Sequence, residues 1–249
     1  MAPFGASRAG LMSTRVDAIP DSGGDHQWDK DEGSDSTIAD SIGTLDGTLV
    51  NNPSWADDAG AGGFYIDYNG TDQYADLGSD SRSELRHFTD DGKGTLFAWV
   101  NPDDVSGQNM IIGSSISTGD TAPGFGLVIL DDGDIRFVGV TDTEGEVPWD
   151  ITASDVIGTG DGWVPVAGTL DGSTARIYVG DGMTEEASGP IDSGDLESND
   201  LEHNASIARE ARDDQRHFDG GIDLVWTDNV ERSQSDLQDF VNDSEDFYS

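Results

Sequence analysis

The chain has 249 residues, and 51 Asp and Glu side chains against 12 Lys and Arg give it a formal net charge of −39. It contains no cysteine, which excludes a disulfide scaffold and any cysteine-ligated zinc or redox site. A hydrophobic fraction of 34% is enough for a buried core, and the length indicates one large all-β domain or two small domains.

The acidic side chains are spread along the whole chain, whereas lysine occurs only at Lys30 and Lys93. This distribution indicates adaptation to very high salt, because at ~1 M salt the Debye length is only ~3 Å and neighbouring carboxylates repel one another little. An acidic interaction surface in ordinary salt is the alternative. Binding to a nucleic-acid backbone is not expected, since both partners would be negative.

The first 25 residues are mixed in character and contain several Gly and Ser, so we expect an N-terminal arm over 1–25 and a domain over 26–249. Residues 1–13 lack the continuous apolar stretch of a secretory signal. The longest apolar run, Leu127–Leu130, has only the length of a strand. No membrane insertion is therefore expected.

From Gln27 onward, short β-type runs alternate with turns rich in Gly, Asp, Asn and Ser, a rhythm typical of a β-sandwich. Asp131–Asp134 and Leu170–Ser173 each contain the Asp-Gly pair that tight hairpins favour. No long crossover helices intervene, so the predicted class is all-β. The clearest strand candidates are Gly63–Tyr68, Tyr74–Leu77, Thr95–Val100, Met110–Gly113, Gly124–Leu130, Ile135–Val140, Trp163–Leu170, Ala175–Val179, Ser206–Ala208 and Gly221–Thr227.

One short helix is predicted near the C-terminus. Ser233 is its N-cap, and Asp236 follows three residues later, as in a capping box. Leu237, Phe240 and Val241 then fall on one face, which we expect to be buried.

The tryptophans divide by their surroundings. In runs such as Leu96–Val100, apolar residues occupy both alternating faces, so these strands should be covered on both sides. Core positions are therefore predicted for Trp99, Trp163 and Trp226. Trp28, Trp55 and Trp149 lie in polar, turn-rich segments and are better candidates for a surface role, although anchoring of a loop is the leading interpretation for each.

Five segments occur in an order that is informative as a set. They are Ile66–Gly78, Thr95–Pro102, Gly162–Val179, Ser206–Arg209 and Phe218–Trp226, followed by the short helix. Together they resemble a LamG-like domain of the concanavalin A-like lectin/glucanase superfamily. The resemblance implies a jelly-roll β-sandwich over nearly the whole chain.

The sequence does not predict catalysis. Glucan-hydrolysing enzymes use two carboxylates facing one cleft, but Gly221–Thr227 carries only Asp223. Glu144 and Glu146 have a suitable separation, yet they lie just before Pro148 in a predicted loop. The sequence contains no HExxH, P-loop or Gly-x-Ser-x-Gly motif. We therefore predict a protein that is not an enzyme.

The resemblance also implies two kinds of site. LamG-like domains often hold a Ca²⁺ ion near the rim of the sandwich, where hard oxygen ligands meet. The matching calcium ligands here are Asp40, Asp72 and Asp223, each with a solvated carboxylate as the alternative. Sugar recognition would use exposed aromatic rings and Asp or Asn side chains, for which the candidates are Trp55, Tyr65, Asn109 and Trp149.

Residues 1–13 are similar to the beginnings of structural proteins of haloarchaeal tailed viruses. With the acidic surface, this resemblance predicts a virion structural or decoration protein, in a capsid turret or a tail, located at the virion surface. Residues 1–25 would dock it to other virion proteins as a homo-oligomer, and the sandwich would meet host-surface glycans. The alternatives are a secreted or cell-surface carbohydrate-binding module of a halophile and a capsid decoration that binds no glycan.

Overall fold

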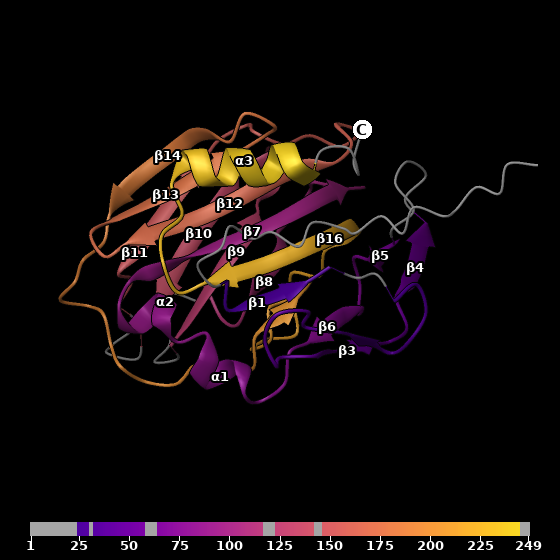
Figure 1. Ribbon diagram of the computed structural model, residues 1–249, viewed down its shortest axis with the longest axis horizontal. Helices are drawn as coiled ribbons and strands as arrows, with labels where there is room; N and C mark the ends of the chain where they lie inside the picture. Colours follow the sequence, from indigo (N-terminus) through magenta and orange to yellow (C-terminus); the bar gives the residue numbers. More distant parts are fainter. Residues whose placement is uncertain (1–23, 30–31, 58–63, 117–122, 142–145, 245–249) are drawn as a thin grey trace, which may run out of the picture.

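The computed structural model describes residues 24–29, 32–57, 64–116, 123–141 and 146–244. Two antiparallel sheets, each of eight strands, pack face to face, and one longer helix lies on the outside (Figure 1). The predicted all-β sandwich with a short C-terminal helix is confirmed. No helix within the described residues is long and apolar enough to cross a membrane.

Sheet A has the strand order β14-β13-β12-β7-β16-β5-β4. Its eighth strand, β1, also pairs with β16. Its strands are β1 His26–Trp28, β4 Ser54–Asp57, β5 Phe64–Asn69, β7 Lys93–Pro102, β12 Val164–Asp171, β13 Thr174–Val179, β14 Thr184–Pro190 and β16 Asp219–Asp228.

Sheet B has the order β11-β10-β9-β8-β15-β6-β3-β2. Its strands are β2 Thr37–Ile38, β3 Gly47–Val50, β6 Tyr74–Asp76, β8 Asn109–Gly113, β9 Gly124–Ile129, β10 Ile135–Val140, β11 Trp149–Ala153 and β15 Ser206–Ile207. The helices are α1 Ser81–Glu84, α2 His87–Asp90, α3 Gln234–Ser244 and the 3-10 turn η1 Asp131–Gly133.

The ten predicted strands are all present, whereas β1 to β4, β11 and β14 and the short helices α1 and α2 were not predicted. Edge strand β14 was missed because its residues, Thr184–Pro190, are mostly polar and exposed. Both predicted hairpin turns are found, and Gly133 and Gly172 adopt the positive φ that such turns need. The predicted arm lies outside the described residues as far as residue 23.

The central strands of sheet A bury apolar side chains on both faces. Along β7, Leu96, Ala98 and Val100 join the main core between the sheets, whereas Phe97 and Trp99 point outward into a second cluster. This alternation confirms the prediction of strands covered on both sides.

Helix α3 covers the outward cluster (Figure 1). Its Leu237, Phe240 and Val241 are buried there, as predicted. The Phe240 ring meets Phe97 edge-on at 5.0 Å and Trp226 at 5.3 Å between centroids. The predicted capping box is also present, since the Ser233 backbone N–H donates to the Asp236 carboxylate.

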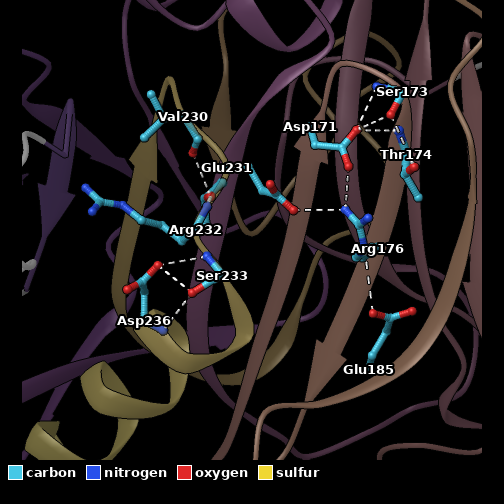
Figure 2. A network of polar contacts seen from close by, with 11 residues as sticks. Asp171, Ser173, Thr174, Arg176, Glu185, Val230, Glu231, Arg232, Ser233 and Asp236 are labelled. Atoms are coloured by element: carbon cyan, nitrogen blue, oxygen red, sulfur yellow. Dashed lines mark hydrogen bonds and ion pairs between the residues drawn. The ribbon is translucent and has the colours of Figure 1, made fainter.

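Arg176 on β13 connects the segment just before α3 to the edge of sheet A (Figure 2). Its Nη1 donates to Asp171 and to Glu231, each at 2.9 Å, and its Nε lies 3.7 Å from Glu185. Burial opposes the charge of Asp171, but hydrogen bonds from Ser173, Arg176 and the backbone outweigh it and lower the pKa of this carboxyl to about 2. One guanidinium thus holds three carboxylates together.

We expect Arg176→Met to lower stability by up to about 1 kcal/mol at low salt, because three carboxylates then face one another without a cation. The loss should shrink in ~3 M KCl, where the Debye length falls below ~3 Å. Thermal unfolding at both salt concentrations measures it. Arg136→Met, which removes a pair with the single carboxylate of Asp150, is the control. An equal loss for Arg176→Met at both salt concentrations would contradict the network's electrostatic role.

Candidate functional site

The candidate site lies on the outer face of sheet A, on strands β5, β7 and β16. Gly221 on β16 lies opposite Asp67 on β5 and opposite Asn101 on β7. Directly opposed residues in antiparallel strands point to the same face, so these three form one row. Asp219, two residues before Gly221, belongs to the same face.

Two aromatic rings meet over Gly221. Tyr65 on β5 and Trp163, immediately before β12, make an edge-to-face pair with centroids 5.0 Å apart and planes at 80°. A Cβ atom at position 221 would come within 2.9 Å of Trp163 and 3.0 Å of Tyr65. Glycine therefore allows both rings to sit against the strand, and both remain half-buried.

Two carboxylates, Asp67 and Asp219, lie on the same face of the sheet as the rings. Burial raises the pKa of Asp67, and the charges of Asp103 and Asp219 raise it further. Burial likewise raises the pKa of Asp219, with Asp103 and Asp104 adding to it. Asp103 is held in place because its backbone N–H donates to the Asp219 carbonyl at 2.9 Å. Like charges disfavour the ionised form of a carboxylate, and the pairing of β5 with β16 together with the Asp103 hydrogen bond brings these residues to one end of the sheet.

We call this surface the Gly221 platform and define it as Tyr65, Asp67, Asn101, Trp163, Asp219 and Gly221. Aromatic rings supply flat apolar surface with a polar tip, and carboxylates supply hydrogen-bond acceptors. The Asn101 amide can both donate and accept. The combination suits a ligand that has an apolar face and a rim of hydroxyl groups.

A second concave feature lies at one edge of the sandwich, where strands β11 and β14 of the two sheets approach each other. Edge strands β11 and β14 line a cleft of about 950 Å³ with the segments that flank them, 147–152 and 187–193. At its floor, Gly189 faces Ile151 so closely that a Cβ would lie 2.7 Å from the isoleucine. This volume falls within the range of ligand sites, so the cleft is a competing location.

The structure separates the four predicted sugar-binding residues. Tyr65 lies on the platform, but Trp55 pairs with Ile66 on the core side and donates its indole N–H to the Asp35 carbonyl at 3.0 Å. Asn109 is buried, and its amide nitrogen lies 3.4 Å from the carbonyl oxygens of Asp104 and Ser106. Trp149 is only 1% exposed.

The expected surface role is therefore wrong for Trp149, and it is wrong for Trp28 as well. The Trp149 ring packs over Gly139 of the neighbouring strand and lies 5.7 Å from Phe137. Trp28 is fully buried and donates to the Leu45 carbonyl at 2.6 Å. Trp99 and Trp226 are in the core as predicted, whereas Trp163 is half-buried.

The three predicted calcium ligands do not come together. In the part of the chain that the structure describes, no group of three or more His, Asp and Glu side chains could hold a metal ion. Asp72 is exposed in the turn after β5 and accepts a hydrogen bond from Asn69. Asp223 is fully buried on β16 and accepts from the Leu224 backbone.

Asp40 is occupied by other partners. Its carboxylate accepts backbone N–H groups of Gln27, Gly43 and Leu45 at 2.8–3.0 Å, and it pairs with His26 Nδ1 at 2.6 Å. Burial opposes its charge, but these hydrogen bonds prevail, so the pKa of Asp40 is lowered. Asp40 thus joins β1 to the loop between β2 and β3.

Sequence analysis missed Asp67, Asn101, Asp219 and Gly221. A signal was present in β5, where Tyr65 and Asp67 alternate with core residues. Which alternating set faces outward beside Trp163 depends on the pairing of strands distant in the sequence. Those pairings are not visible in the sequence itself.

Comparisons with known proteins agree with this fold. A family model described as the concanavalin A-like lectin/glucanases superfamily matches residues 69–238. No curated protein matches the sequence. Domain 4 of AbnA, a GH43 extracellular arabinanase from Geobacillus stearothermophilus solved with arabinotriose, is similar with a TM-score of 0.60 and 18% identity, over 87% of this chain and 97% of that one.

The binding domain of botulinum neurotoxin serotype D is similar with a TM-score of 0.59 and 13% identity, over 88% of this chain and 50% of that one. A leech intramolecular trans-sialidase gives a TM-score of 0.53 and 16% identity, over 69% of this chain and 26% of that one. This chain thus spans half of the toxin structure and about a quarter of the sialidase. At these identities the likeness establishes the fold.

We expect Asp40→Asn to cost about 1–3 kcal/mol, because the amide is a weaker acceptor and turns one NH₂ toward buried donors. The extra stability of the wild-type protein is fully present above pH 3.8, the ordinary pKa of an Asp carboxyl. It is lost as the pH falls through the lower pKa that Asp40 has in the folded protein. Urea unfolding between pH 5 and pH 2 should therefore show the two proteins converging. Asp72→Asn in the exposed turn is the control and should change little. A difference in unfolding free energy between the two proteins that stays constant down to pH 2 would contradict the stabilising role of the ionised Asp40.

Proposed function

The chain belongs to the concanavalin A-like lectin/glucanase superfamily, and we propose that it is a glycan-binding module whose binding surface is the Gly221 platform. The observation that carries this proposal is the edge-to-face pair of Tyr65 and Trp163 over Gly221, flanked by Asp67 and Asn101. A pyranose or furanose ring can stack its C–H face on such a pair. Its hydroxyl groups can then donate to the carboxylates at the rim.

The similar structures support a carbohydrate ligand. Domain 4 of AbnA was solved with arabinotriose, and this chain covers nearly all of that domain. We extend that property to the present chain as part of the proposal. We also propose that the module binds without cleaving.

The larger context is proposed from the sequence. The acidic surface and residues 1–13 support display on a virus particle, with residues 1–25 as the attachment segment. A free carbohydrate-binding module of a halophile and a decoration without glycan binding are the alternatives.

Glycan binding can be tested with arabinotriose, xylohexaose, cellohexaose and chitohexaose, titrated calorimetrically in ~0.15 M and ~3 M KCl. Trp163→Ala should weaken binding of any hit by at least about tenfold, which corresponds to ~1.4 kcal/mol of stacking energy. Tyr65→Ala should act in the same direction. A reducing-end assay on the same samples should detect no cleavage.

Thr152→Trp adds a bulky ring to the lining of the β11/β14 cleft and lies outside the platform, so it is the matched control. Normal binding by Thr152→Trp with loss in Trp163→Ala places the site on the platform. The reverse pattern would move the site to the cleft. Circular dichroism should show that all variants are folded.

The attachment segment can be tested by light scattering after size exclusion in ~3 M KCl. We expect the full chain to form a discrete oligomer and a version lacking residues 1–23 to be monomeric. This truncation keeps Asp25, whose backbone N–H donates to Thr227 at 3.0 Å. Monomers in both cases would remove the assembly role of the arm and favour a free-standing module.

A further inference from the structure

We propose that the Gly221 platform selects its glycan by charge: Asp67 and Asp219 reject acidic sugars and favour sugars that carry a free amine. This inference rests on the proposed function, because it concerns the ligand class of the same surface. It assigns a specificity role to two side chains that touch the ligand's polar rim and leaves the stacking role to the rings.

The negative groups reach the platform from three separate parts of the fold. Asp67 comes from β5, Asp219 from the start of β16, and Asp103 and Asp104 from the segment just after β7. The Asp103 N–H bond to the Asp219 carbonyl holds that segment against β16. The backbone thus fixes the positions in the fold from which these carboxylates project.

These carboxylates already repel one another. Besides burial, the charges of Asp103 and Asp219 raise the pKa of Asp67, and those of Asp103 and Asp104 raise the pKa of Asp219. Asp104 itself stays charged, because the hydroxyl and the N–H of Ser106 donate to it and lower its pKa. A ligand carboxylate or sulfate placed here would add a further negative charge to this group.

Hydrogen-bond chemistry leads to the same selection. An ionised carboxylate only accepts hydrogen bonds, so Asp67 and Asp219 require donors from the ligand. Hydroxyl and ammonium groups donate, and an ammonium group also neutralises part of the local charge. An acidic sugar would present acceptors to these two acceptors, and the Asn101 amide can supply hydrogen bonds but no positive charge to offset the repulsion. Neutral glycans are therefore tolerated, amine-bearing glycans are preferred, and acidic glycans are excluded.

The opposite charge pattern occurs elsewhere on the molecule. Around Arg176, three carboxylates share one guanidinium, so their mutual repulsion is offset. On the platform, the charged groups that shift the pKa of Asp67 and Asp219 are carboxylates, and no cation is among them. An approaching cationic ligand would take the place that Arg176 occupies in the other cluster.

The test is a glycan microarray probed with the labelled full chain at pH 6 in ~0.15 M and ~3 M KCl. The array carries neutral, amine-bearing and acidic glycans. Two pairs among them share the same sugar chain and differ only in charge. These are chitohexaose with its deacetylated form, and oligogalacturonate with its methyl ester. We expect the deacetylated form to bind at least fivefold more than chitohexaose, and oligogalacturonate at least tenfold less than its ester.

The double variant Asp67→Asn/Asp219→Asn should move both ratios toward one, and Asp103→Asn should do so partially. The control Glu186→Gln/Asp195→Asn removes the same net charge from exposed or half-exposed positions away from the platform, and it should leave the ratios unchanged. The contrast between glycans should be larger at low salt, where screening is weaker.

Equal binding of acidic and neutral partners by the wild-type protein would overturn the charge selection while leaving glycan binding intact. Ratios that change equally in the platform and control variants would show that net charge acts, and would also overturn the role of Asp67 and Asp219. An array without any bound glycan would overturn the proposed function and this inference with it.

Discussion

The structure depends on the burial of sheet A on both of its faces. A strand that places large apolar side chains on alternate sides cannot lie at a surface, so β7 and β16 need two partners. Sheet B covers one face, and α3 covers part of the other. Phe97 and Trp226 stack at 5.4 Å beneath Phe240, and these rings account for the position of the helix.

The platform is a consequence of the same arrangement. Helix α3 covers the outer face over β7, β12 and β13, and Tyr65 and Trp163 occupy the face beyond it. Gly221 allows the two rings to close over β16, so the aromatic surface continues from the helix-covered cluster toward the polar end of the sheet. The surface that we assign to glycans is therefore the uncovered continuation of a packed face.

Electrostatics divides the surface into compensated and uncompensated regions. With 12 basic residues against 51 acidic ones, cations are few, and several are placed where carboxylates would otherwise meet. Arg176 serves three carboxylates, and Arg136 forms a two-bond pair with Asp150. The charged groups that shift the pKa of Asp67 and Asp219 are instead other carboxylates. Such repulsion costs stability, so its concentration beside an aromatic pair is consistent with a binding role.

The sequence by itself determined the fold class, ten of the strands, both Asp-Gly hairpins and the capped helix, because each depends on residues close together in the chain. It also placed Trp99 and Trp226 in the core through their alternating neighbours. It did not determine the site. Trp149 and Trp28 have polar neighbours in sequence yet are buried, since burial is decided by partners such as Gly139 and Leu45. Gly221, Asp67 and Asn101 become one row only when β16 pairs between β5 and β7, and that register is set by packing across the whole sandwich.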